Sequence, residues 1–215
     1  MKKIDTFRDK GLRSQMVERL KIRDIRNISV LNAIREVPRH FFLDSAFLEF
    51  AYRDNAFPIG CDQTISNPYT VAFQSELLSP SPNDKILEIG TGSGYQSAIL
   101  CKIGCKVYSI ERHRDLHLKA KQNLSYLKCN VSLFYGDGYL GLPRHAPFDK
   151  IIVTAGAQQV PNPLKEQLRI GGILVIPVGL KKLKMTIILK TGKDSYEVIS
   201  EYDNFKFVPL LRDKK

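Results

Sequence analysis

No stretch of the 215-residue sequence approaches the roughly 18 consecutive apolar residues that a membrane-spanning helix requires. The opening segment, residues 1–10, does not contain the apolar centre of a secretory signal. We therefore expect a cytoplasmic protein that does not contact membranes. Because 43% of the residues are hydrophobic, the chain can still bury a substantial core.

Cysteine pairs with metal-binding spacing are also absent. The four cysteines lie at 61, 101, 105 and 129, with no C-x-x-C pair and no histidine at ligand spacing. This pattern argues against a zinc site, and we expect no bound metal. In a reducing compartment the cysteines are expected to be free thiols that pack as small apolar residues.

Positive charge exceeds negative charge, with 33 Lys and Arg against 22 Asp and Glu, a net charge of +11. Such an excess can indicate nucleic-acid binding. Here the basic residues are spread along the chain, acids lie between them, and the aromatic and arginine pattern of an RNA-binding module is missing. We interpret the charge as a solvated basic surface and expect no nucleic-acid partner.

A glycine-rich turn connects an apolar strand, residues 85–89, to a predicted helix that begins at Tyr95. Its spacing does not fit G-x-G-x-x-G, and the Gly-Lys-Ser/Thr of a phosphate-binding loop is absent. Glycines still let the backbone approach a ligand closely, although such a turn can be purely structural. The glycines are Gly90, Gly92 and Gly94.

Three successive predicted strands carry an acid at or near their carboxyl ends. Glu88 lies just before the glycine turn, Glu111 ends the apolar run 106–110, and Asp137 follows the run 131–135. Open α/β sheets bind ligands at this end of their strands. Glu111 is placed to accept hydrogen bonds from a ribose and Asp137 to accept one from an adenine amino group. Each acid alone could be a solvated loop residue, but together they predict an adenosyl cofactor.

The remaining periodicity predicts an α/β fold with a doubly wound, mostly parallel seven-stranded sheet and an N-terminal helical cover. Helices are expected at 5–20, 29–36, 67–78 and 163–168, and further strands at 149–154, 172–177, 185–190, 196–200 and around 205–210. The late strands form an antiparallel addition. We expect one domain over 1–215, with a substrate-side segment (1–80), a cofactor-binding core (81–180) and C-terminal strands (181–215).

Motifs along nearly the whole chain resemble the protein-L-isoaspartate O-methyltransferase family, a Rossmann-like class I methyltransferase family. They include V-P-R-H-x-F at 37–42, A-Y-x-D at 51–54, P-I-G-x-x-Q-T-I-S at 58–66, L-E-I-G-T-G-S-G-Y-Q at 87–96, G-D-G at 136–138 and F-V-P-L at 207–210. The Q-T-I-S and F-V-P-L elements are not shared by methyltransferases in general. The resemblance implies methyl transfer from S-adenosyl-L-methionine to the free α-carboxylate of L-isoaspartyl residues in damaged proteins.

The resemblance also implies roles for individual residues. Ser66, just before a helix that Asn67 and Pro68 begin, is expected to orient the acceptor carboxylate as the catalytic residue. The alternative is that Thr64 and Ser66 only form local backbone hydrogen bonds. Expected substrate contacts are Asp54, Ile59, Ser66, Val208 and Pro209, and expected cofactor contacts are Gln63, Thr64, Ile65, Gly90, Thr91, Gly92, Ser93, Glu111, Arg112, Asp137 and Gly138.

Two positions depart from the family pattern and leave alternatives open. Asp62 stands where the family usually has glycine, and the family's glutamine after Pro177-Val-Gly179 is missing near Lys184. With these departures, the chain could instead be a module that binds the cofactor but no longer catalyses methyl transfer. The net charge allows an RNA methyltransferase, but the Asn/Asp-Pro-Pro-Tyr/Phe loop for base amines is replaced by the sequence at 154–157.

Overall fold

The computed structural model describes residues 3–215, and its centre is a seven-stranded sheet in the order β5-β4-β3-β6-β7-β8-β9. Neighbouring strands from β5 to β7 run parallel, whereas β8 and β9 are antiparallel additions at one edge. This arrangement confirms the predicted sheet. The strands are β3 (Lys85–Ile89), β4 (Lys106–Glu111), β5 (Val131–Tyr135), β6 (Phe148–Val153), β7 (Leu168–Val178), β8 (Leu183–Lys190) and β9 (Tyr196–Phe205).

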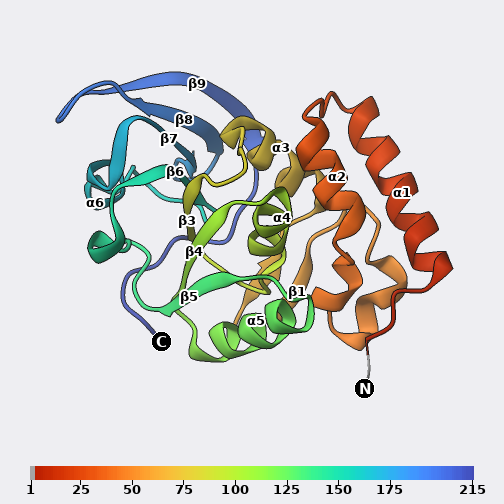
Figure 1. Cartoon of the computed structure of the whole chain (residues 1–215). Helices are drawn as coiled ribbons and strands as arrows, with labels where there is room; N and C mark the ends of the chain where they lie inside the picture. Colours follow the sequence, from red (N-terminus) through yellow and green to blue (C-terminus); the bar gives the residue numbers. More distant parts are fainter. Residues whose placement is uncertain (1–2) are drawn as a thin grey trace.

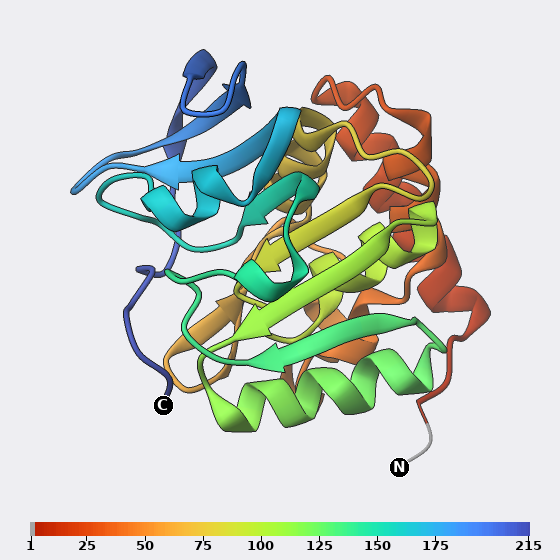
Figure 2. The same cartoon turned by 60° about the vertical axis from the view of Figure 1, so that its left-hand side comes forward.

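Helices cover both faces of the sheet, as Figures 1 and 2 show. They are α1 (Phe7–Ile22), α2 (Ile28–Glu36), α3 (Pro68–Leu78), α4 (Tyr95–Ile103), α5 (Arg114–Tyr126) and α6 (Asn162–Glu166), with 3₁₀ turns η1 (Arg39–Phe42), η2 (Ser45–Phe50) and η3 (Pro143–His145). α3 and α4 pack on one face, α6 packs on the other, and α1 with α2 forms an outer layer over α3 and α4. No helix within residues 3–215 combines the length and apolarity that crossing a membrane requires.

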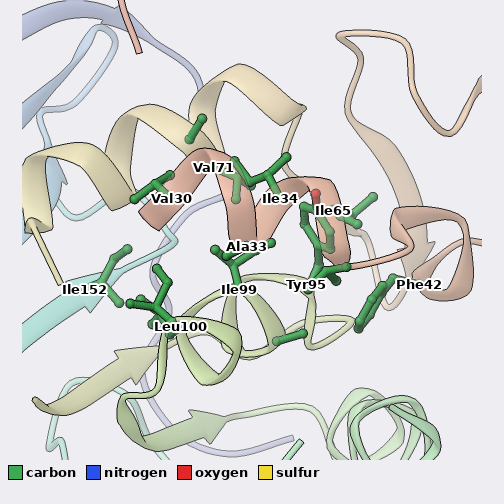
Figure 3. Packing of buried hydrophobic residues seen from close by; sticks show 14 of the residues in the cluster. Val30, Ala33, Ile34, Phe42, Ile65, Val71, Tyr95, Ile99, Leu100 and Ile152 are labelled. Carbon is green, nitrogen blue, oxygen red and sulfur yellow. The ribbon is translucent and has the colours of Figure 1, made fainter. Parts of the chain in front are cut away.

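The two faces of the sheet are buried in two separate clusters. Along β3, Ile86 belongs to the cluster under α4, and Leu87 and Ile89 belong to the cluster on the opposite face. This alternation follows from the two-residue period of a strand. Figure 3 shows the first cluster, where α2, α3 and α4 meet over β6. Its side chains include Val30, Ile34, Val71, Ile99 and Ile152, none more than 4% exposed.

Predicted start signals form the first turns of two helices. Thr6 and Asp9 make a reciprocal capping box at α1. At α3, the Asn67 side chain accepts a hydrogen bond from the Thr70 N–H at 2.7 Å, and Pro68 occupies the first helical position. The cap fixes where the chain leaves the preceding segment, and with it the position of Ser66.

The segment before α3 contains a short hairpin of β1 (Phe57–Gly60) and β2 (Gln63–Ile65). Its turn places Cys61 and Asp62 at φ values of 54° and 56°. Such a turn requires left-handed residues at both central positions. Asp62 therefore keeps the geometry that a glycine would adopt there, as its tolerance of this region predicts.

The predicted strand around 205–210 is wrong. β9 ends at Phe205, and the next residues cross the end of the sheet toward the β6–β7 connection. There the Gly156 N–H donates to Val208 O and the Leu210 N–H donates to Gly156 O, both at 2.8 Å. Pro209 has no N–H with which to extend a strand. The helix expected at 163–168 is also displaced, because α6 spans Asn162–Glu166 and β7 begins at Leu168.

Replacing Asn67 by Ala removes the side-chain acceptor at the start of α3. We expect Asn67→Ala to lower the free energy of unfolding by about 1 kcal/mol, the usual loss for such a cap. Asn67→Asp, which keeps an acceptor oxygen, is the matched control and should unfold close to the unmodified protein. Urea unfolding of the three proteins measures the effect, and equal midpoints for Asn67→Ala and Asn67→Asp would contradict it.

Candidate active site

The sheet changes its direction of winding between β3 and β6, and this is where the glycine turn lies. The chain leaves β3 and β6 toward opposite faces, so a crevice opens at their carboxyl ends. Gly90 follows β3 with φ 94°, and a Cβ there would lie 2.6 Å from Thr154 Oγ1. Thr154 Oγ1 lies 2.6 Å from Gly90 O, to which it donates. Glycine is therefore required for this close approach.

The main cavity lies in this crevice and brings Ser66 together with the glycine turn. The hairpin and the start of α3 supply one wall, and Val208 closes another side. No hydrogen bond within residues 3–215 uses the hydroxyl of Ser66 or Thr64, which disfavours the alternative of purely local bonding. The cavity is lined by Gln63, Thr64, Ile65, Ser66, Val71, Gln74, Gly90, Thr91, Gly92, Ser93, Tyr95, Gln96, Thr154, Ala155 and Val208.

A second cavity adjoins the main cavity and shares Gln63, Gly90 and Ala155 with it. Its walls come from the ends of β3 and β4 and from the segment that follows β9. Predicted cofactor contacts here are Glu111, Arg112 and Gly138, while Pro209, a predicted substrate contact, also lies in this wall. A long ligand can thus extend from Ser66 past the glycine turn to Glu111.

Glu111 fastens the glycine turn to β4. Its Oε2 accepts from the Gly92 N–H at 2.8 Å and its Oε1 from the His113 N–H at 2.9 Å. The side chain is buried, at 4% exposed, yet it lines the second cavity. Each carboxylate oxygen keeps a further lone pair, so Glu111 can still accept hydrogen bonds from two ligand hydroxyls.

Several predicted contacts are engaged elsewhere. Asp54 lines neither cavity, because its carboxylate pairs with Arg23 and accepts from the Tyr69 N–H. Asp137 is likewise outside the lining and accepts from the N–H groups of Tyr139 and Asp213. Their ligand contacts stay predictions.

Two more predicted contacts have roles inside the protein, and only Arg112 lines a cavity. Ile59 is buried behind the turn, with its Cδ1 3.3 Å from where a Cβ on Gly92 would lie. The Arg112 guanidinium donates to the carbonyl oxygens of Asp213 at 2.9 Å and Arg212 at 3.1 Å. Arg112 therefore ties the C-terminal residues over the second cavity, and its contact with a ligand also stays a prediction.

Two glutamines that the sequence reasoning did not single out lie in the main cavity. Gln74 anchors α3 to β6 through its Nε2, which donates to Val153 O at 3.0 Å. Gln96 donates to Ser75 Oγ at 2.9 Å, while its buried Oε1 accepts no hydrogen bond within residues 3–215. An unpaired buried acceptor beside a glycine turn fits the ammonium group of an amino acid. Gln96 is the last residue of the motif at 87–96, whereas Gln74 belongs to none of the sequence motifs.

Glu88 is buried under the glycine turn without a cationic partner. Burial raises its pKa to about 7, and hydrogen bonds from Ser97 and Ser109 only partly oppose this. Ser109 also bonds to Thr91 in the turn, at 2.6 Å between the hydroxyl oxygens. Glu88 Oε2 accepts from the Ser97 hydroxyl of α4, while the buried Oε1 has no partner within residues 3–215, so the acid is only partly satisfied.

Within residues 3–215, one group of acidic and histidine side chains lies close enough together to hold a metal ion: Asp5, Asp9 and His40. None of the three lines either cavity. Each already has a protein partner. Asp5 pairs with Arg13 at 2.9 Å, Asp9 Oδ2 accepts from the Thr6 N–H at 3.0 Å in the capping box of α1, and His40 Nδ1 lies 2.6 Å from the Tyr52 hydroxyl. The cluster is therefore explained as a brace between α1 and η1.

Comparison of the sequence with known families and proteins supports the predicted resemblance. A family model described as "Protein-L-isoaspartate(D-aspartate) O-methyltransferase (PCMT)" matches residues 11–215. A protein-L-isoaspartate O-methyltransferase of Christiangramia forsetii is 54% identical over 211 residues, covering 98% of this chain and 99% of that protein. One of Dictyoglomus thermophilum is 45% identical, covering 97% and 95%. These matches confirm the recognition made from the motifs.

Solved structures confirm the fold. A protein-L-isoaspartate O-methyltransferase superposes with a TM-score of 0.79 at 29% identity, covering 92% of this chain, which spans 65% of that chain. A second structure, a protein of this type from Plasmodium falciparum in complex with S-adenosyl-L-homocysteine, gives a TM-score of 0.80 at 23% identity and covers 94% and 99%.

The raised pKa of Glu88 predicts a specific pH dependence of stability. Between pH 4.5 and about 7 the folded protein retains a proton that the unfolded chain releases, so stability falls as pH rises through this window and then levels off. Glu88→Gln removes the penalty. We expect the variant to be more stable at pH 8 by on the order of 3 kcal/mol, from 1.36 kcal/mol per pKa unit.

Urea unfolding at pH 4.5 and pH 8 measures this difference. Glu197→Gln, an exposed carboxyl on β9, is the control and should change little at either pH. A Glu88→Gln advantage of the same size at both pH values would contradict the titration of Glu88.

Proposed function

This chain belongs to the protein-L-isoaspartate(D-aspartate) O-methyltransferase family, and we propose that it methylates the free α-carboxylate of L-isoaspartyl residues in damaged proteins. The methyl donor is S-adenosyl-L-methionine. The methyl ester can then close to a succinimide without the enzyme, and hydrolysis returns part of the material to aspartate. The observation that carries the proposal is the presence of Ser66 and the glycine turn in one cavity.

The arrangement of the two cavities supports the choice of cofactor. Gln96 Oε1 offers an acceptor to the amino-acid end, and Glu111, in the adjoining cavity, offers acceptors to the ribose hydroxyls. The turn between them lets the ligand lie against the backbone at Gly90. When bound, the sulfonium of the cofactor supplies an electrophilic methyl group. The chain's own contribution is to fix both ends of the ligand.

The acceptor needs orientation but not deprotonation. A carboxylate with a reference pKa near 4 is already ionised at neutral pH, so no general base is required. The Ser66 hydroxyl, free of other partners within residues 3–215, can donate to one carboxylate oxygen and direct the other toward the methyl group. Such positioning can lower the activation free energy by several kcal/mol. This explains why none of the residues that line the main cavity with Ser66 needs to be a histidine.

Recognition of the damaged residue depends mainly on its main chain. Isoaspartate lengthens the backbone by one carbon, and the walls beside Ser66 are the segment 58–66 and the segment 207–210 that crosses the sheet end. Val208 lines the main cavity with Ser66, and Pro209 lines the adjoining second cavity, which supports both as proposed substrate contacts. We also propose that the protein is located in the cytoplasm.

One assay separates this proposal from its alternatives. The chain is incubated with tritium-methyl cofactor and with an isoaspartyl peptide, its aspartyl twin, or bulk RNA. Label in the isoaspartyl peptide alone supports the proposal. Label in RNA supports an RNA methyltransferase, and cofactor binding without any label supports a module that has no catalysis.

Ser66→Ala removes the donor that orients the acceptor. We expect methylation of an isoaspartyl peptide to fall by about tenfold or more, or about 1.4 kcal/mol in the barrier. Cofactor affinity, measured by calorimetry, should stay nearly unchanged. Ser132→Ala, at an exposed position of β5, is the control and should keep full activity. Equal turnover of Ser66→Ala and Ser132→Ala would refute the role.

Glu111→Ala removes the acceptors at the second cavity and the bonds to Gly92 and His113. We expect the dissociation constant for the cofactor to rise by about tenfold or more, because hydrogen bonds to charged groups contribute about 1.5–3 kcal/mol. Calorimetry measures this, with Glu197→Ala as an exposed control. Thermal unfolding of both variants shows whether the fold is retained, and an unchanged dissociation constant in folded Glu111→Ala removes the assignment.

A further inference from the structure

A groove on the surface lies between α3 and the end of β9, separate from the two cavities of the active site. Its volume is about 660 Å³, within the usual range of ligand sites. Figure 1 shows the end of β9 beside α3, and ring contacts between the two elements agree with this view. β9 is the last strand of the sheet, so this groove borders a free edge.

The floor of the groove is aromatic. Phe73 of α3 stacks on Phe205 and meets Tyr202 edge to face, each with ring centroids 5.2 Å apart. Tyr69, one helical turn earlier, stacks on Phe73 at 5.6 Å. Tyr202 remains 40% exposed and is accessible to a partner. An exposed aromatic cluster of this kind favours apolar and aromatic side chains.

Charges of both signs lie at the rim of the groove, and two of them are paired within the protein. Arg23 lies over the Tyr69 ring, 3.5 Å from its centroid, and pairs with Asp54. Glu201 pairs with Lys184 at 3.0 Å. The other two charged residues of the rim, Asp203 and Lys206, have opposite signs. Because the rim carries no excess of either charge, it does not select strongly for a charged ligand, and the aromatic floor decides what binds.

The groove and the main cavity are joined through two chain connections. Ser66 lines the cavity and the next residue, Asn67, lines the groove. Lys206 lines the groove, and Val208, two residues later, lines the cavity. Consecutive Cα atoms are about 3.8 Å apart, so the groove begins immediately beside the site of the acceptor carboxylate.

We propose that this groove binds an apolar or aromatic side chain of the substrate polypeptide, close in sequence to the isoaspartyl residue. The inference rests on the proposed function, because a polypeptide acceptor must continue out of the cavity on both sides of the damaged residue. Phe73 follows Ser66 by seven residues, which is about 10 Å at the helical rise of about 1.5 Å per residue. An extended chain advances about 3.3 Å per residue, so the substrate residue that reaches Phe73 lies within about three positions. Tyr202 then acts as a specificity residue that affects substrate binding, not methyl transfer.

The test uses three synthetic isoaspartyl peptides of equal length. One has glycines at all flanking positions, one has phenylalanine two residues before the isoaspartyl residue, and one has it two residues after. We expect at least one phenylalanine peptide to have a KM about fivefold or more below that of the glycine peptide, as expected for an aromatic contact. Tyr202→Ala should abolish this difference and leave kcat and the KM of the glycine peptide unchanged.

Two further variants make the result specific. Tyr202→Phe keeps the ring and should retain the preference, and Val198→Ala, an exposed position of β9 outside the groove, should behave like the unmodified protein. Equal KM values for all three peptides overturn the inference while the proposed function stands. So does a Tyr202→Ala effect of equal size on all three peptides. Methylation of none of them overturns the proposed function and this inference with it.

Discussion

The active site depends on the reversal of strand order between β3 and β6. Since the connections from these strands leave on opposite faces, the backbone opens at their carboxyl ends, and a ligand can enter without disturbing the sheet. Two side chains hold the opening in shape. Thr154 bonds to the Gly90 carbonyl from β6, and Glu111 accepts from the Gly92 N–H from β4. The glycine turn is therefore held by hydrogen bonds from both neighbouring strands.

A buried acid below the turn shows what this arrangement costs. Glu88 accepts from the Ser97 hydroxyl of α4, and one of its oxygens has no partner within residues 3–215. No cationic side chain among these residues pairs with it, and burial raises its pKa. A protein selected only for stability has no reason to keep a carboxyl there, since an uncharged side chain of the same shape avoids the burial penalty. The position thus illustrates stability given up near a site where the backbone must be held in one geometry.

The chemistry explains why the site is built from positioning groups. An ionised carboxylate is already a nucleophile, so the residues around it need to align the reactants and exclude other geometries. The hairpin and the capped start of α3 carry Ser66 to the crevice, and Val208 reaches it from the other end of the chain. The aromatic groove beside Asn67 extends the same surface outward, which suits a substrate that is itself a polypeptide.

Local sequence patterns were sufficient to predict the turns and helix caps that a few consecutive residues form. The glycine spacing predicted a turn and the Asn67-Pro68 start predicted a helix cap, and the structure contains both. Their geometry is set by a few consecutive residues, so it can be read from the chain without knowledge of its neighbours. The alternation of strands and helices likewise determined the parallel part of the sheet.

Tertiary structure decided the features that depend on distant partners. The segment after Phe205 alternates like a strand, yet its hydrogen bonds go to Gly156, across the end of the sheet. Asp54 belongs to a motif, but Arg23 and the α3 backbone engage it away from the cavity. Gln74 reaches the cavity because α3 packs on β6. In each case a contact with a residue remote in sequence outweighed the local pattern, because burial and hydrogen bonding are satisfied only once the layers have packed.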